Sequence, residues 1–330
     1  MSTPKPVTIG KYLDGIYPSL ALLAGMQLDI FTHLNNGAQS AEEVAQALNA
    51  DAQKVSMVLY ALVAAELLTV DEGRFFNTDE SAFYLAKGSP GYFGDIHSVL
   101  GSMWFAAFHT AETIRTGEPQ VKIDYHIEDM PEEEIAAFHG MHKLSMMVVR
   151  NLTRSIDFSQ HQHVADIGGG TGGIAIGLTH AYPELQATVV DLPDVTPMTA
   201  QFVEQSPTKD RIQIVSANVV ENPLEGDYDA AIMRSFTQVL AADDVAAALK
   251  NSANAIVSGG KLYIVAQILD DSRTEPNITA FTNLAFLNLY DGGQAYTVSE
   301  YRGWLEAAGF SDVQHAMLTR NDSIITATRV

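Results

Sequence analysis

The second half of the chain limits the fold most strongly, because short β-like runs alternate there with segments of helical spacing. Strand–helix alternation of this kind predicts a mostly parallel sheet with helices on both faces. Near the end of the chain, two further runs flank Arg320-Asn321-Asp322 and predict an antiparallel edge. The sequence therefore predicts an α/β fold with a Rossmann-like sheet whose parallel strands begin near residues 163, 186, 212, 228 and 261.

The first hundred or so residues have a different, helical pattern. Apolar residues recur at helical spacing over residues 12–34, and the sequence Ser-Ala-Glu-Glu at 40–43 is a capping box at the start of another helix. A further helix is expected over about 51–68, and Asp-Glu-Gly at 71–73 predicts the turn of a hairpin. Helix, turn, helix and hairpin follow one another in the order of a winged helix.

A winged helix suggests DNA binding, but the charges of this chain argue against it. Segment 51–68 carries one cation, Lys54, whereas a recognition helix needs Arg, Lys, Asn or Gln at the base edges. The whole chain has 19 Lys and Arg against 40 Asp and Glu, and a formal charge of −21 repels phosphate backbones. Apolar side chains around much of segment 51–68 predict contact with protein on more than one side. We therefore expect residues 1–108 to form a dimerisation domain that binds no nucleic acid.

Composition also limits the site chemistry and the cellular location that we expect for the protein. With no cysteine in 330 residues, the chain can form neither disulfides nor thiolate nucleophiles nor cysteine metal sites. No apolar run reaches the roughly 18 residues of a membrane span, and the start of the chain lacks the pattern of a signal peptide. These features lead us to expect a cytoplasmic protein with no membrane partner.

The segment between the two halves is helical again, with Gly117 as a predicted helix end. Residues 131–156 form a long predicted helix with Pro131 at its start and acidic residues in its first turn. His139 and His142 are three residues apart and share one face of this helix. Without cysteine or an HExxH pattern we expect no metal site there, and we expect these histidines to face substrate or to be packed.

The sharpest motif is Asp-Ile-Gly-Gly-Gly-Thr-Gly-Gly at 166–173, between a predicted strand and the helix after it. Glycines let the backbone approach a ligand closely, and a helix N-terminus offers free N–H groups. Gly168, Gly170 and Gly173 match the GxGxxG pattern, and Asp191 ends the next strand, where a carboxylate can bind ribose hydroxyls. The motif predicts a nucleoside-containing cofactor, with nicotinamide and flavin cofactors among the candidates.

Three features favour S-adenosylmethionine over a dinucleotide. Asp166 lies two residues before Gly168, where its charge would attract the ammonium group of a methionine moiety rather than a pyrophosphate. The glycine loop follows a long helical segment and opens the α/β half. The chain ends in two adjacent predicted strands, as methyltransferase sheets do. Asn218, at the end of the third strand, would then lie beside the adenine.

Nearly the whole chain resembles the dimeric small-molecule O-methyltransferases of the plant caffeic-acid and bacterial hydroxyl-methylating type. VADIGGGTGG, VVDLPDV and EYRGWLEAAGF are similar to motifs of that family. The resemblance implies a catalytic domain over 109–330, a small-molecule acceptor, and a homodimer whose N-terminal half reaches into the partner's acceptor pocket. The cofactor contacts that it implies are Gly168, Asp191, Leu192, Asn218, Val219 and Arg234, with Met141 and Ser145 matching an M-x-x-x-S pattern.

The resemblance breaks down at the catalytic base. The family's base is a histidine just after the fourth strand, and Gln238 stands at the matching position. Gln294 likewise stands where relatives often carry a Glu that steadies the histidine. Glutamine has no titratable proton, so Gln238 can only orient a substrate by hydrogen bonds. Catalysis is expected either without a base or with a base that has moved, for which the candidates are His142, His139, His109 and Tyr290.

Two interpretations of the reaction follow from this difference. A phenol with a pKa near 10 must lose its proton during methyl transfer, and a positioned base contributes about 10²–10⁴-fold. An acidic phenol or enol, a thioether or a neutral amine needs no such base. The resemblance favours O-methylation, and S- or N-methylation, such as conversion of a methylthio acid to a sulfonium, is the alternative.

Two other interpretations have less support. One is a relative that uses the cofactor only structurally. The other is a non-enzymatic winged-helix regulator, which the acidity and the glycine loop oppose. The apolar residues expected to line an acceptor pocket, or to form a dimer core, are Trp104, Phe105, Phe108, Met146, Phe281, Phe286 and Tyr290.

Overall fold

The computed structural model describes residues 3–35, 37, 39–123 and 132–330, apart from the side chains of residues 132–139. Its internal contacts divide the chain into two compact units, Met1–Gly101 and Ser102–Val330. Helix α7 (His97–Ala107) runs across this division. Within the part of the chain that is described, no helix is both long and apolar enough to cross a membrane.

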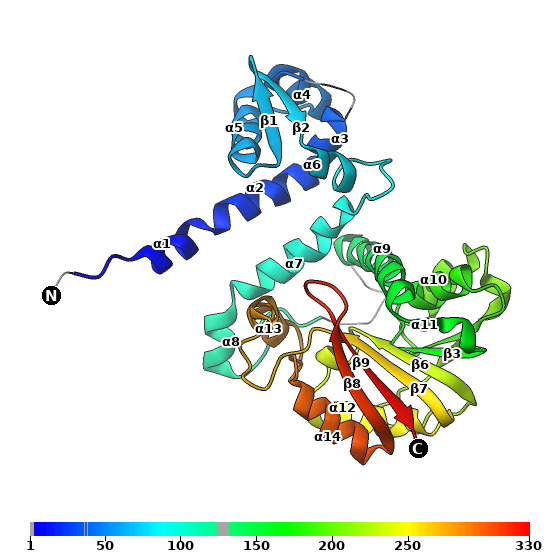
Figure 1. Cartoon of the computed structure of the whole chain (residues 1–330). Coiled ribbons are helices and arrows are strands. Elements are labelled where there is room, and N and C mark those ends of the chain that lie inside the picture. Colours follow the sequence, from blue (N-terminus) through cyan, green and yellow to red (C-terminus); the bar gives the residue numbers. More distant parts are fainter. Residues whose placement is uncertain (1–2, 36, 38, 124–131) are drawn as a thin grey trace. The chain divides into compact units, whose positions relative to one another are not determined.

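The first unit consists of short helices and one hairpin (Figure 1). Its elements are α1 (Val7–Asp14), α2 (Ile16–Gln27), α3 (Ile30–Leu34), α4 (Ala41–Leu48), α5 (Ala52–Ala64), β1 (Leu68–Asp71), β2 (Arg74–Asn77), α6 (Asp79–Tyr84) and η1 (Gly94–Ile96). The predicted order of two helices followed by a hairpin is confirmed. The capping box is also present, since Ser40 Oγ accepts the Glu43 N–H at 3.2 Å and the Glu43 carboxylate accepts the Ser40 N–H at 2.7 Å.

Residues 12–34, where apolar residues recur at helical spacing, belong to three helices, α1, α2 and α3. The chain turns between α2 and α3 at Asp29, which has a left-handed φ of 55° that ends the helical path. The expected helix over 51–68 stops at Ala64, because Glu66 takes a φ of 61° and starts the connection to β1. Apolar spacing continued through both breaks, and so it could not reveal them.

The core of the first unit lies between α2–α5 and the hairpin, with Phe31, Leu59 and Phe75 fully buried. Helix α1 has no buried residue. Large apolar side chains are exposed along α1 and α2, namely Val7, Ile9, Tyr12, Leu13, Ile16, Tyr17 and Leu20. This unit therefore presents an apolar surface of its own.

The second unit contains a seven-stranded sheet in the order β5-β4-β3-β6-β7-β9-β8. The strands are β3 (His163–Ile167), β4 (Gln186–Asp191), β5 (Ile212–Ser216), β6 (Tyr228–Arg234), β7 (Ile256–Ala266), β8 (Phe310–Met317) and β9 (Ser323–Arg329). The first five in this order pair in parallel, and β9 is antiparallel to both β7 and β8. The predicted mostly parallel sheet with an antiparallel C-terminal edge is confirmed.

Helices cover both faces of the sheet (Figure 1). The helices of this unit, besides α7, are α8 (Thr110–Thr116), α9 (Glu132–Ser155), η3 (Phe158–Gln160), α10 (Gly173–Ala181), α11 (Thr196–Glu204), η4 (Lys209–Arg211), η5 (Thr237–Val239), α12 (Ala242–Ala253), α13 (Asn277–Leu289) and α14 (Val298–Ala307). One buried cluster joins α9 and α10 to side chains such as Ile232 and Tyr263, and another joins α12 and α14 to the opposite sheet face. The expected helix end at Gly117 is present, with a φ of 78°. Pro131 lies outside the described residues.

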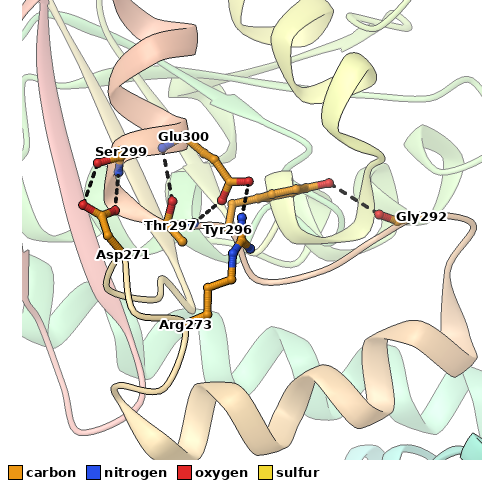
Figure 2. Close-up of polar contacts among 7 residues, drawn as sticks. All are labelled: Asp271, Arg273, Gly292, Tyr296, Thr297, Ser299 and Glu300. Carbon is orange, nitrogen blue, oxygen red and sulfur yellow. Dashed lines mark hydrogen bonds and ion pairs between the residues drawn. The ribbon is translucent and has the colours of Figure 1, made fainter.

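The connection that leaves β7 is held against the start of α14 (Figure 2). The Asp271 carboxylate accepts both the N–H (3.1 Å) and the hydroxyl (2.6 Å) of Ser299. Arg273 pairs with Glu300 at 2.7 Å, and Glu300 closes a second capping box with Thr297. These contacts fix the path of the chain beyond the carboxyl end of β7.

Candidate cofactor and acceptor site

The glycine loop lies at the carboxyl end of β3 and depends on glycine for its shape. Gly168 and Gly170 have φ values of 67° and 55°, in the left-handed region that L side chains rarely adopt. A Cβ on Gly168 would lie 2.3 Å from a ring carbon of Phe236, which covers that residue. Gly168 also donates its N–H to the Val190 carbonyl at 2.8 Å, which ties the loop to β4.

Asp191 ends β4 and holds the glycine loop from the other side. Its two carboxylate oxygens accept the N–H of Gly170 at 2.7 Å and the N–H of Leu192 at 2.8 Å. Burial raises the pKa of this carboxyl, while both hydrogen bonds act to lower it. Each carboxylate oxygen has further lone pairs, so Asp191 can hold the loop and still accept ligand hydroxyls.

Asp166 has an unsatisfied oxygen at the same edge of the sheet. Its Oδ2 accepts the Ala175 N–H from the first turn of α10 at 3.1 Å, whereas the buried Oδ1 has no hydrogen-bond partner among the described residues. Burial raises its pKa to about 7, with a smaller rise from Asp191 and an opposing effect from Arg234. An unpartnered buried carboxylate oxygen suits a ligand's ammonium group, so the site fits the methionine end of S-adenosylmethionine.

Helix α9 packs against the start of α10 and brings its predicted residues to the glycine loop. A Cβ on Gly173 would lie only 2.7 Å from the Ser145 Cβ, so the two helices approach closely there. Met141 packs against Val195 and Met198, and its carbonyl accepts the Ser145 hydroxyl at 3.0 Å. The face of α9 that carries Met141 and Ser145 thus borders the cofactor end of the sheet.

His142 lies on the same helix but is engaged with protein groups. Its Nδ1 is 2.9 Å from the Thr171 hydroxyl of the glycine loop. Its ring stacks on Phe202, with centroids 4.5 Å apart and an interplanar angle of 24°. These contacts indicate that His142 supports the loop. His139 lies within α9, but its side chain is outside the described residues.

Arg234 ends β6 next to this group. Its guanidinium donates to the Ser145 hydroxyl at 3.4 Å, while its buried Nε has no hydrogen-bond partner among the described residues. Burial lowers its pKa, which the negative charges of Asp322 and Asp166 oppose. A positive charge with an unused donor at this edge suits a ligand with a carboxylate or carbonyl oxygen.

Asn218 and Val219 follow β5 at the same edge of the sheet. Asn218 Oδ1 accepts the Val220 N–H at 3.1 Å, which shapes the turn after the strand. Val219 is buried against the core beneath α12. Because the carboxyl ends of β3, β4, β5 and β6 meet at one edge, the structure gathers the predicted cofactor residues there.

Gln238 lies in the 3₁₀ turn η5 after β6 and is buried. Its Oε1 accepts the main-chain N–H of Gln267, the residue that follows β7, at 3.2 Å. Since that donor is a main-chain N–H, the atom it reaches is the amide oxygen rather than the nitrogen. The Gln238 side chain therefore keeps its NH₂ group as the end available to a ligand.

The other two base candidates, His109 and Tyr290, and the Gln294 position of the family's supporting Glu are less favourably placed. His109 precedes α8, where its ring meets Phe105 edge-on at 5.2 Å. Gln294 is exposed in the turn before α14. Tyr290 ends α13 and packs in the apolar cluster of Leu269 and Ala295.

The apolar residues expected to line a pocket fall into two groups. Phe105, Phe108 and Phe281 are largely exposed, with 58%, 69% and 51% of their surface accessible. Phe286 is buried in the same apolar cluster as Tyr290, and Trp104 and Met146 are partly buried. All of these residues belong to the second unit, and only the second group is buried or partly buried in it.

The fold and the glycine loop define an α/β domain with a candidate nucleoside-cofactor site at the carboxyl edge of its sheet. Comparison with protein families gives two matches, to an O-methyltransferase dimerisation domain over residues 11–87 and to an O-methyltransferase domain over residues 114–311. The chain belongs to this O-methyltransferase family. It is an S-adenosylmethionine-dependent methyltransferase that acts on a small molecule, as the sequence predicts.

Curated relatives support this assignment over nearly the full chain. The 3-hydroxy-5-methyl-1-naphthoate 3-O-methyltransferase of Streptomyces sahachiroi is 29% identical, over 94% of this chain and 90% of the relative. The tetracenomycin polyketide synthesis 8-O-methyl transferase TcmO of Streptomyces glaucescens is 26% identical, over 93% and 92%. Among solved structures, human N-acetylserotonin methyltransferase in complex with SAM has the same fold, with a TM-score of 0.84 at 22% identity over 100% and 99% of the two chains.

Several residues of this edge were not predicted from the sequence. Phe236 over Gly168, Thr171 beside His142, and Gln267 beside Gln238 all depend on contacts between segments far apart in the chain. The sequence position of Gln267 could have indicated a site residue, because a polar residue directly after a buried parallel strand lies at the ligand edge of the sheet.

Proposed function

We propose that the enzyme methylates an oxygen that is already ionised when it binds, such as that of an acidic phenol or enol. The orientation of Gln238 carries this proposal. Its oxygen is occupied by the Gln267 N–H, and its NH₂ group can donate hydrogen bonds to an anionic oxygen but can take no proton from a neutral one. The chain's contribution at this position is then to bind and orient the oxygen rather than to deprotonate it.

The surroundings of His142 agree with a site in which no described side chain acts as a base. One ring nitrogen contacts Thr171 and the ring face is covered by Phe202, so we assign His142 a role in supporting the glycine loop. Tyr290, which packs in the apolar cluster of α13, is likewise assigned no catalytic role. Desolvation and alignment of the acceptor then account for catalysis, as expected for an acceptor that arrives as an anion.

The residues gathered at the sheet edge form our proposed cofactor site. Bound there, S-adenosylmethionine supplies an electrophilic methyl group. Asp166 would pair with its ammonium group, Asp191 would accept the ribose hydroxyls, and Arg234 would face the carboxylate end. The remaining members of the proposed site are Gly168, Gly170, Leu192, Asn218, Val219, Met141 and Ser145.

Methylation of nitrogen or sulfur is a second candidate for the reaction, and one curated relative supports it. The N,N-dimethyltransferase OxyT of Streptomyces rimosus is 26% identical to this chain, over 88% of this chain and 86% of the relative. A neutral amine or a thioether, like an ionised oxygen, reacts without a protein base. The Gln238 contact alone does not separate these acceptors, so the test must compare them.

We further propose that the enzyme is a homodimer formed through residues 1–108, with residues 109–330 as its catalytic domain. The match to an O-methyltransferase dimerisation domain and the exposed apolar side chains of α1 and α2 support this. Replacing Tyr12 and Tyr17 by aspartate should give monomers in analytical ultracentrifugation. A variant that stays dimeric would contradict this interface.

The reaction can be tested with matched acceptors and S-adenosylmethionine labelled in its methyl group. At about pH 8, 4-nitrophenol is mostly ionised, whereas 4-methylphenol keeps its proton with a pKa of about 10. We expect kcat/KM for 4-nitrophenol to exceed that for 4-methylphenol by about 10²-fold or more, the range that a base would otherwise supply. Gln238→His should narrow this difference.

Two results would overturn the proposal. One is equal kcat/KM for the two phenols in the unmodified enzyme, which requires a protein base. The other is transfer to aniline or to thioanisole with no transfer to either phenol, which would establish the second candidate instead.

A further inference from the structure

The Gln267 side chain has an unmet hydrogen-bonding requirement. Its Oε1 is buried and has no hydrogen-bond partner among the described residues, while its own main-chain N–H is used by Gln238. A buried polar atom without a partner destabilises the folded protein. The position therefore has a physical reason to bind a hydrogen-bond donor from outside the chain.

The alternation of side chains along β7 places Gln267 between two parts of the site. Tyr263 and Val265 face the cluster beneath α9 and α10, on the sheet face that also carries Asp166 and Arg234. Leu269 packs with Phe286 and Tyr290 on and after α13. Residues 263, 265, 267 and 269 point to the same side of an extended segment. Gln267 is thus between the cofactor edge and the apolar cluster of α13.

The backbone around Gln267 is held on both sides. Gln267 N–H binds Gln238, and two residues on, Leu269 donates to the Tyr296 carbonyl at 2.9 Å and accepts the Val298 N–H at 3.1 Å. Beyond it, Asp271 and Arg273 are fixed to α14 (Figure 2). Because the segment is held on both sides, it cannot easily move Gln267 Oε1 to a hydrogen-bond donor within the protein. A bound ligand can supply that donor instead.

We propose that Gln238 and Gln267 form a complementary donor–acceptor pair that selects acceptors with two adjacent functional groups. The Gln238 NH₂ group donates to the ionised enol or phenol oxygen, and Gln267 Oε1 accepts from a hydroxyl or amino group on the neighbouring carbon. The Gln267 N–H bond to Gln238 sets the spacing of the two amides. This assignment rests on the proposed function, because it needs an anionic oxygen at Gln238, and it adds the second group that the acceptor must carry.

Two hydroxyquinones provide a matched pair of probes. Both 2-hydroxy-1,4-naphthoquinone and 2,3-dihydroxy-1,4-naphthoquinone are acidic enols, and only the second has a hydroxyl next to the ionised oxygen. Calorimetric titration of the full-length enzyme with S-adenosylhomocysteine present measures their binding without turnover. We expect the dihydroxy compound to bind about 10-fold more tightly or better, because it satisfies a buried acceptor.

Variants of Gln267 separate this contact from other causes. Gln267→Leu removes the unpartnered oxygen and should make the two quinones bind equally, with thermal unfolding as the check on folding. Gln267→Glu keeps an acceptor oxygen but adds a negative charge, so both quinones should bind more weakly while the preference persists. Gln238→Leu should weaken both quinones by similar factors.

The outcomes that contradict the pair are distinct from those that contradict the reaction. Equal binding of both quinones by the unmodified enzyme, a preference that survives in Gln267→Leu, or no binding of either quinone would overturn the assignment. Whether 2-hydroxy-1,4-naphthoquinone is then methylated on oxygen is read separately, by product analysis with S-adenosylmethionine. Failure of that transfer alone would count against the proposed function.

Discussion

Asp166→Asn should stabilise the protein without ligand at high pH while it abolishes tight cofactor binding. Asp166 is buried, one of its oxygens has no partner among the described residues, and burial raises its pKa to about 7. In the unfolded chain an aspartate has a pKa of about 3.9. Between about pH 4 and pH 7 the unfolded state is therefore ionised while the folded state retains its proton. Unfolding becomes easier as the pH rises through this window.

The size of the effect follows from the two pKa values. Each pH unit in the window lowers the free energy of unfolding by about 1.4 kcal/mol, and the loss is complete above about pH 7. From about pH 5 to about pH 8 the unmodified protein thus loses about 3 kcal/mol through Asp166. Asparagine does not titrate, so Asp166→Asn avoids this loss. The asparagine amide nitrogen lies buried without a partner at both pH values. The stability that it costs is therefore the same at both, and it cancels when the stabilities at the two pH values are compared.

Urea unfolding of both proteins at about pH 5 and about pH 8 measures this difference. The free energy of unfolding of Asp166→Asn, minus that of the unmodified protein, should rise by about 3 kcal/mol over the interval. Titration with S-adenosylmethionine should show affinity falling about 5-fold from pH 7 to pH 6 in the unmodified protein, because an ionised Asp166 is needed, and weak binding without this dependence in the variant. A stability difference that does not change with pH would show that folding does not raise the pKa of Asp166.

Three further predictions concern the same edge of the sheet. Asp191→Asn keeps an oxygen for the Gly170 N–H, so it should fold normally while losing cofactor affinity in calorimetry. Asp191→Ala should lose cofactor affinity and also about 1–3 kcal/mol of stability in urea unfolding. Equal stability of the two variants would show that the loop contact is unimportant. Gly173→Ala places a Cβ 2.7 Å from the Ser145 Cβ and should cost about 1–3 kcal/mol in urea unfolding, and no loss would contradict the close helix contact. His142→Asn should leave the pH dependence of kcat unchanged, and a lost inflection with a drop of about 10²-fold or more would make His142 the base.

The order and type of most elements could be predicted because their signals are local. The capping box at Ser40, the two-residue turn before β2 and the strand–helix alternation after residue 163 each lie within a few residues of sequence. The breaks at Asp29 and Glu66 could not be predicted, since both residues adopt left-handed backbone conformations that apolar spacing does not encode. Local patterns thus predict the architecture, and the helix ends that they miss depend on the backbone angles of single residues.

Only the residues of the candidate site that lie at strand ends or in the glycine loop could be predicted from the sequence. Asp166, Gly168, Gly170 and Asp191 follow from strand ends and a glycine pattern, which share one edge of any parallel sheet. The contact of Gln267 with Gln238 depends on how β6 and β7 pair, and no spacing in the sequence gives it. Whether a buried oxygen has a partner is likewise a property of the folded chain.

We propose that no residue of this methyltransferase deprotonates the acceptor. The most direct measurement is the pH dependence of kcat/KM for the acceptor, at saturating S-adenosylmethionine, with 4-nitrophenol and a second phenol of different acidity. We predict that each profile rises through the pKa of its own phenol and is then level. Profiles that share one inflection, whichever phenol is used, would reveal a base on the enzyme and contradict the account.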